Sequence, residues 1–271
     1  MVPAEIMLQI GKVKRIAICI SGELRSWKQS MNTWKHITNI PGVEVDFFFH
    51  TWNSKNPPTS FYNEKMKEGK PIEELIEMYN EKISVEEFDE LIRLIKPKGY
   101  LIEPSREFEP KNDQQTIFKS SHISQYYGVM MAGRLKKKYE LENDFIYDIV
   151  VRTRFDLQYY HDIITNPDKI KKDIIYGFHH NFEVKHSKWL GRVADMFWYS
   201  DSVTHDILSD YFFDLPNLTL DKMERFLDPE YSWFNYIKKN QITIQPNVDW
   251  VIKIIRESEE HRINKNSEHE I

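Results

Sequence analysis

The 271-residue chain carries 37 basic and 42 acidic residues and is 41% hydrophobic, with seven tryptophans and sixteen phenylalanines. This composition can fill a substantial core, and a net charge of −5 argues against nucleic acid as a partner. The one cysteine, Cys19, lies in an apolar run, which excludes an intrachain disulfide and favours a buried thiol in a reducing, cytoplasmic setting. No apolar run reaches the ~18 residues of a membrane span, so we expect no integral membrane segment.

The first third of the chain opens as an α/β unit. The apolar run KRIAICI at 14–20 predicts a buried strand that stops at Ser21-Gly22. The stretch that follows, 23–37, has apolar residues at helical spacing. A second run, VEVDFFFHTW at 43–52, is too apolar for an exposed strand. Strand, glycine turn, helix and strand are the opening of a sheet that helices flank.

The segment 54–98 changes to charged and helical composition, and we interpret it as a helical insertion or lid. Ser84 and Glu87 have the spacing of a capping box at the start of an amphipathic helix. KGYLIEP at 98–104 then predicts a return to a strand that ends on a proline.

The longest helix is predicted over 120–144, where apolar residues recur on one side. Gly128 and Gly133 interrupt this pattern and indicate close packing on a sheet. The three lysines at 136–138 indicate a solvated helix end. Further strands are predicted at 147–152, 173–180, 195–200 and 242–246, and further helices at 202–213 and 229–239. We therefore predict a single α/β domain over 1–271, with a mostly parallel central sheet and a polar tail at 257–271.

Polar side chains follow three of the predicted strands. Ser21, Gly22 and Arg25 follow the first, His50 and Trp52 end the second, and Arg152, Arg154 and Asp156 end the strand in YDIVVRTRFDL. In an open parallel sheet the carboxyl ends of the strands meet at one edge, where ligands bind. Period two also aims the last three side chains at one face. We therefore expect these eight residues to form one site.

Each of these residues also has a structural interpretation. The glycine turn, packed strand-end aromatics and an ion pair among Arg152, Arg154 and Asp156 would account for them without a ligand. Against this, three charged groups at the end of an apolar strand cost several kcal/mol to bury without partners. Guanidinium groups clamp phosphate oxygens, and a carboxylate suits a divalent metal or a sugar hydroxyl. A nucleotide-sugar donor meets all of these demands.

Other nucleotide and hydrolase chemistries lack their motifs. The chain has no Walker-type loop and no GxGxxG after a strand, which argues against P-loop NTPases and dinucleotide oxidoreductases. The HExxH and GxSxG motifs are also absent from the sequence.

The segments ICISGELRSW, VDFFFHTWN, SQYYGVMMAGRLKKKYE and YDIVVRTRFDL occur in this order. Together they resemble a bacterial and viral glycosyltransferase family related to capsule and lipopolysaccharide biosynthesis proteins. The resemblance covers roughly 14–52 and 118–250. It implies a GT-A-like nucleotide-diphospho-sugar transferase fold, with the R-x-R-x-D strand end where other members carry a metal-binding D-x-D.

The departure from D-x-D leaves the role of a metal open. Arg154 takes the first acidic place and Asp156 alone remains as a ligand for Mn²⁺ or Mg²⁺ or as a catalytic group. Arginine side chains can instead neutralise the leaving diphosphate directly. On the acceptor side, Asp195 matches a family position, and Glu230 follows Pro229 at a predicted helix start. Either carboxylate is a candidate for the base that deprotonates the acceptor hydroxyl.

These observations predict a cytoplasmic glycosyltransferase that moves a sugar from a nucleotide-sugar donor to a glycan or lipid-linked acceptor in surface polysaccharide or glycoconjugate synthesis. Two other classes stay open. A non-catalytic nucleotide-sugar or glycan-binding protein would use the same cluster without turnover, and a phosphoryl or nucleotidyl transferase would use the same arginines on a different bond.

Overall fold

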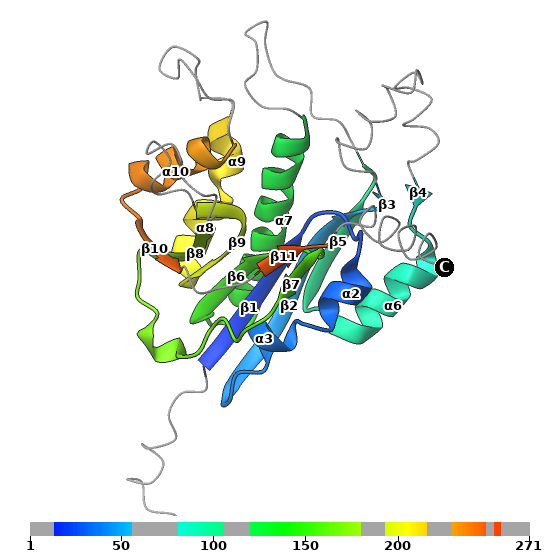
Figure 1. Ribbon diagram of the computed structural model, residues 1–271, viewed down its shortest axis with the longest axis horizontal. Helices are drawn as coiled ribbons and strands as arrows, with labels where there is room; N and C mark the ends of the chain where they lie inside the picture. Colours follow the sequence, from blue (N-terminus) through cyan, green and yellow to red (C-terminus); the bar gives the residue numbers. More distant parts are fainter. Residues whose placement is uncertain are drawn as a thin grey trace, which may run out of the picture.

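The structure is a computed structural model that describes residues 14–55, 81–105, 120–179, 193–215, 229–247 and 252–255. Seven strands in this part of the chain build the central sheet: β1 (Lys14–Ser21), β2 (Val43–Trp52), β5 (Gly99–Glu103), β6 (Ile149–Thr153), β8 (Ile174–His179), β9 (Val193–Ser200) and β10 (Thr243–Asn247). Their order across the sheet is β10-β8-β9-β6-β1-β2-β5 (Figure 1).

The sheet is mixed but mostly parallel. Strand β1 runs parallel to β2 and β6, β2 runs parallel to β5, and β10 runs parallel to β8. Only β9 is reversed, and it pairs antiparallel with both β6 and β8. The start of β9 therefore lies at the same edge of the sheet as the carboxyl ends of its neighbours.

Helices cover both faces of this sheet (Figure 1). One face carries α7 (Ser120–Glu142), α8 (Ser202–Ser209), α9 (Tyr211–Asp214) and α10 (Pro229–Lys239). The other carries α2 (Trp27–Met31), α3 (Lys35–Thr38), α6 (Val85–Ile95) and the strand pair β7 (Leu157–Tyr159) and β11 (Ile252–Ile254). Two smaller features are the strand pair β3 (Ser54–Lys55) and β4 (Glu81–Lys82) and the 3₁₀ turn η1 (Pro167–Lys169).

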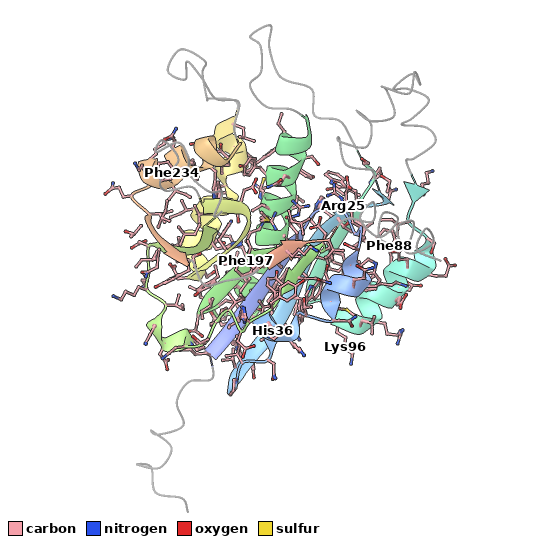
Figure 2. All side chains as sticks on the ribbon, viewed as in Figure 1. Arg25, His36, Phe88, Lys96, Phe197 and Phe234 are labelled. Atoms are coloured by element: carbon pink, nitrogen blue, oxygen red, sulfur yellow. The ribbon has the colours of Figure 1, made fainter. Side chains whose placement is uncertain are left out.

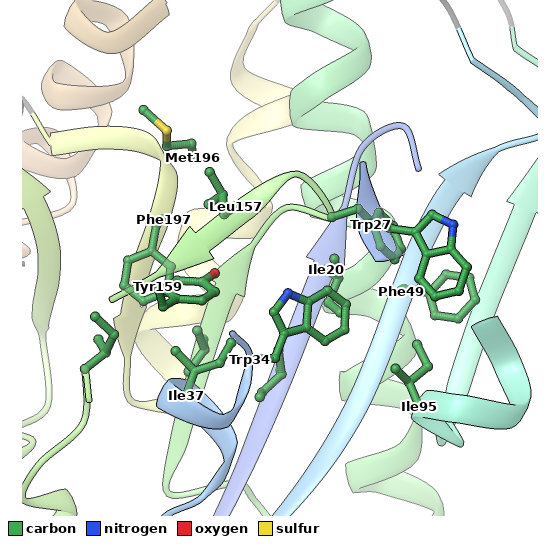
Figure 3. Close-up of a cluster of buried hydrophobic side chains, with 14 of the residues drawn as sticks. Ile20, Trp27, Trp34, Ile37, Phe49, Ile95, Leu157, Tyr159, Met196 and Phe197 are labelled. Atoms are coloured by element: carbon green, nitrogen blue, oxygen red, sulfur yellow. The ribbon is translucent and has the colours of Figure 1, made fainter. Parts of the chain in front are cut away.

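Alternation along β1 builds both halves of the core. Ile16, Ile18 and Ile20 are fully buried on the α2–α3 face, in one hydrophobic cluster with Trp27 and Trp34 and with residues of β7 and β9 (Figure 3). Burying one such side chain contributes about 1.5–3 kcal/mol. Cys19 points to the α7 face, and burial raises the pKa of its thiol to about 12. This thiol is therefore structural, as the apolar run around it predicts.

The elements predicted from the sequence are present within the described residues, with shifted ends. The stretch 23–37 forms two short helices, α2 and α3, rather than one. The capping box is confirmed in its first half, because the Ser84 hydroxyl accepts a hydrogen bond of 3.2 Å from the Glu87 amide. Most of the predicted insertion and the polar tail at 257–271 lie outside the described residues. The single domain stays a prediction.

The prediction of a solvated lysine run at 136–138 is wrong at its first position. Lys136 is fully buried, and its ammonium donates to Glu140 at 2.9 Å, to Ser202 at 2.5 Å and to Asp206 at 2.6 Å. Lys136 lies inside α7, one and a half turns before its end, on the side that α8 covers. This ion pair network joins the two helices.

The two glycines of α7 allow close contacts with two different elements. A Cβ on Gly128 would lie 3.2 Å from the His50 ring and 3.3 Å from Ser21, so this glycine lets α7 approach the ends of β1 and β2. A Cβ on Gly133 would lie 2.6 Å from the Ser209 hydroxyl, so it packs on α8 and not on the sheet.

Candidate active site

The three predicted strand ends are neighbours. In the register of the sheet, Ser21 at the end of β1 stands beside His50 on β2, and Cys19 stands beside Arg152 on β6. The Gly22 amide donates to the His50 carbonyl at 3.3 Å, which fastens the turn after β1 to β2. The polar residues that end or follow β6, β1 and β2 therefore lie along one edge of the sheet, where they form two clusters rather than the single group expected from the sequence.

Asp156 is the centre of an ion-pair cluster. Arg154 donates to it through two nitrogens, from Nε to Oδ1 at 2.8 Å and from Nη2 to Oδ2 at 2.6 Å. Arg25 adds a third hydrogen bond, from Nη1 to Oδ2 at 3.3 Å. The strand ends at Thr153, so Arg154 and Asp156 face each other across a turn. The prediction that strand alternation extends to residue 156 is wrong, but the charged groups still meet.

Charge neighbours outweigh burial in this pair. Burial by itself raises the pKa of Asp156, but Arg154 and Arg25 lower it further, and the net pKa lies below the ordinary value. Burial likewise opposes the charge on Arg154, but Asp156 holds the pKa of Arg154 above its ordinary value. Asp156 is 1% exposed, whereas Arg154 and Arg25 are 19% and 21% exposed. The carboxylate is thus a buried anchor for two cations that reach solvent.

Arg152 lies buried beside this cluster. Its Nη1 donates to the backbone carbonyls of Thr153 and, at 3.3 Å, Met196. Its Nε and Nη2 are buried without a hydrogen-bond partner among the residues that the structure describes. Burial first, and then repulsion from Arg154, lowers the pKa of Arg152 to about 10, so it keeps its charge at neutral pH. An incompletely paired guanidinium at this depth is costly unless an anion completes it.

The turn after β1 is held in a strained form. Gly22 has φ +126°, which glycine adopts freely, but Arg25 has φ +31°, which is uncommon for any other residue. Such strain costs on the order of 1–3 kcal/mol and persists where surrounding contacts impose it. Here the Arg25 side chain is fixed by Glu23 at 3.0 Å and by Asp156. Figure 2 shows Arg25 beside the ends of β1 and β2.

Asp195 joins the cluster because β9 is reversed. It is the third residue of β9, and its Oδ2 accepts a 2.7 Å hydrogen bond from Gln125 of α7. Its charge raises the pKa values of both Arg152 and Arg154, which places it within electrostatic reach of them. Glu230 is the second residue of α10, and its side chain lies outside the described part of the structure.

His50 and Trp52 form a second cluster with Glu103, which is not among the site residues predicted from the sequence. His50 is fully buried and Trp52 is 4% exposed, and their rings pack edge to face at 4.7 Å. The His50 Nε2 lies 2.9 Å from Oε2 of Glu103, the last residue of β5, and the Tyr127 hydroxyl donates to the same oxygen at 2.9 Å. Its position at the end of the predicted strand KGYLIEP is the sequence feature that could have identified Glu103 as a site residue.

The residues present do not fit a divalent metal on Asp156. Both of its oxygens accept hydrogen bonds from guanidinium groups, and those cations repel a metal ion. No group of three or more potential His, Cys, Asp or Glu ligands occurs among the described residues. We therefore assign Asp156 to positioning the arginines and derive no metal-dependent step.

Comparison with protein-family models and with curated proteins finds no match for this chain. A search of the described residues finds no helix long and apolar enough to span a membrane.

Proposed function

We propose that this protein is a GT-A-like glycosyltransferase that transfers a sugar from a nucleotide-sugar donor to a glycan or lipid-linked acceptor. The observation that carries the proposal is the buried, incompletely paired guanidinium of Arg152, which lies beside the partly exposed Arg154 at the ligand-binding edge of a mostly parallel sheet. A diphosphate supplies the anionic oxygens that such a group lacks.

In this proposal the arginines bind the donor and stabilise its leaving group. Arg154 and Arg25 contact the diphosphate directly. The buried guanidinium of Arg152 stabilises the negative charge of the diphosphate electrostatically. Asp156 holds two of these cations in place before the donor binds, so little reorganisation is needed as negative charge develops on the leaving oxygen.

The proposed base is Asp195. Its carboxylate is held by Gln125 and lies within electrostatic reach of the arginine cluster. The acceptor hydroxyl attacks the anomeric carbon while the bond between that carbon and the diphosphate oxygen breaks. The proton of the hydroxyl passes to Asp195, and the nucleoside diphosphate leaves with the electron pair. Glu230 stays a second acceptor-side candidate.

Donor chemistry and the single buried thiol both favour a cytoplasmic site of action in surface polysaccharide or glycoconjugate synthesis. The resemblance of the four sequence segments to capsule and lipopolysaccharide glycosyltransferases supports the same setting.

Calorimetry with nucleotide sugars, followed by assay of nucleoside diphosphate release, tests the proposal. Arg154→Ala is expected to weaken donor binding about ten- to a hundred-fold, because charge-assisted hydrogen bonds are lost. Arg15→Ala is the matched control, since Arg15 lies at the opposite end of β1 and pairs with Glu44. Failure of every nucleotide sugar to bind would contradict the proposal.

Asp195→Asn separates binding from chemistry. It is expected to keep donor affinity within about three-fold while turnover falls about 10²–10⁴-fold. Asp162→Asn, at an exposed carboxylate paired with His36, is the control. Donor binding without any diphosphate release in the unmodified protein would favour a non-catalytic binding protein. Release of nucleoside monophosphate would favour a phosphoryl or nucleotidyl transferase.

A further inference from the structure

The order of the strands gives the site two flanks. Glu103 ends β5 at one side of the site, and Asp195 lies near the start of β9 at the other, with Arg152, Arg154 and Arg25 between them. Both carboxylates are oriented by hydrogen-bond donors from α7, since Tyr127 binds Glu103 and Gln125 binds Asp195. A ligand whose phosphates contact the arginines can thus meet one carboxylate at each end.

The Glu103 carboxylate is fixed rather than mobile. Its Oε2 accepts hydrogen bonds of 2.9 Å from the His50 ring nitrogen and from the Tyr127 hydroxyl. Trp52 stacks on Tyr127, with ring centroids 5.9 Å apart. The Glu103 side chain is still 24% exposed, whereas His50 is fully buried. The buried ring therefore orients a carboxylate that reaches solvent, and does not itself reach a ligand.

The distance from β5 to the turn after β1, which carries Arg25, matches a nucleoside diphosphate. Strand β5 is two strands from β1, or about 10 Å at the usual interstrand spacing, and Arg154 follows β6, which is one strand farther. Eight covalent bonds join a ribose 2′-oxygen to the β-phosphorus, and they span about 10 Å when extended at roughly 1.2 Å per bond. A carboxylate that accepts from a ribose diol is a known solution for nucleotide recognition at strand ends.

We propose that Glu103 binds the ribose hydroxyls of the donor nucleotide, with His50 and Tyr127 as positioning residues. The sugar then points toward β9 and Asp195. This assignment rests on the proposed function, because it requires that the protein bind a nucleotide diphosphate.

Titration calorimetry with UDP and GDP and with their 2′-deoxy forms tests the assignment. The unmodified protein is expected to bind the ribose form about ten-fold or more tightly than the deoxy form, since a hydrogen bond to a charged group is lost in the latter. Glu103→Gln is expected to bring this ratio close to one while affinity for the deoxy form stays within about three-fold. A ratio near one in the unmodified protein, or the same ratio in Glu103→Gln, would overturn the assignment.

Variants of the positioning residues give a readout that misfolding does not mimic. Tyr127→Phe removes one donor to Glu103 and is expected to lower the ratio about three-fold. Tyr100→Phe is the control for this variant. Tyr100 lies on β5, the strand that Glu103 ends, and its exposed ring stacks on Phe49. His50→Gln, which keeps a side-chain N–H donor, is expected to retain more of the ratio than His50→Phe.

The outcomes separate the two proposals. If no nucleoside diphosphate or nucleotide sugar binds, the glycosyltransferase proposal fails and this assignment fails with it. If nucleotides bind and Glu103→Gln abolishes turnover while the ratio is unchanged, Glu103 serves the sugar or the acceptor, and only the ribose assignment is overturned.

Discussion

Arg154 and Asp156 are two residues apart in the chain and face each other across the turn after β6, joined by hydrogen bonds of 2.8 and 2.6 Å. The carboxylate is almost completely buried, whereas the guanidinium reaches solvent. In the proposed function, this pair of a buried anion and a partly exposed cation presents positive charge to the donor diphosphate. It is also a contribution to stability that depends on pH.

Asp156→Asn is expected to lower the free energy of unfolding by about 1.5–3 kcal/mol at pH 7, because charged hydrogen bonds are lost. The pKa of Asp156 is lowered in the folded protein, so its contribution is complete above the unfolded value of about 3.9 and is lost as the pH falls through the folded value. Urea unfolding of both proteins between pH 7 and pH 3 measures this difference. If the difference in unfolding free energy between the two proteins stays constant over that pH range, the contribution of the ion pair to stability is contradicted.

Arg152→Met is expected to separate stability from binding. Burial and Arg154 lower the pKa of Arg152 to about 10, so holding its charge at neutral pH opposes folding. An apolar side chain of similar length is therefore expected to leave stability unchanged or to raise it by about 1–4 kcal/mol. Nucleotide affinity is expected to fall at least ten-fold. Thermal unfolding and calorimetry check the two effects, and a variant that loses stability but not affinity would make Arg152 structural.

Lys136→Met is expected to destabilise the protein by about 3–5 kcal/mol, since it leaves Glu140 and Asp206 without their buried cation. Lys138→Met is the matched control, because Lys138 is 71% exposed and its pair with Glu142 is open to solvent. Urea unfolding measures both changes. The affinity of the folded Lys136 variant for nucleotides is expected to be unchanged, and a selective loss of affinity would give the network a role in the site.

Gly128→Ala tests how closely α7 must approach the strand ends. Helix propensity alone predicts a gain of up to about 1 kcal/mol. The added Cβ would lie 3.2 Å from the buried His50 ring and 3.3 Å from Ser21, so we expect a net loss of about 1–2 kcal/mol. Displacement of His50 should also reduce the preference for ribose over deoxyribose nucleotides. A net gain in unfolding free energy would show that the helix can shift without cost.

Metal removal is expected to leave nucleotide binding intact. Because Asp156 is saturated by Arg154 and Arg25, UDP affinity with EDTA should lie within about three-fold of that with Mn²⁺. Titration of the protein with Mn²⁺ alone is the accompanying measurement, with no binding expected at Asp156. Strengthening of UDP binding by Mn²⁺ of more than ten-fold, lost in Asp156→Asn, would restore the metal-ligand role.

Local patterns in the sequence are sufficient to predict the strands and helices and the edge of the sheet at which the polar strand ends lie. Alternation in β1 and β2 and the glycine turn at Gly22 are local patterns, and a parallel sheet gathers its strand ends whatever its exact order. These properties depend on neighbours in the chain, so they can be read without the structure.

The contacts of each polar group depend on how distant segments of the chain pack. The reversal of β9 brings Asp195 to the arginines, and the pairing of β5 with β2 brings Glu103 to His50. Packing of α8 on α7 buries Lys136, which the run of lysines gave no reason to expect. Strand order and helix packing join residues far apart in the chain, and no local pattern specifies those partners.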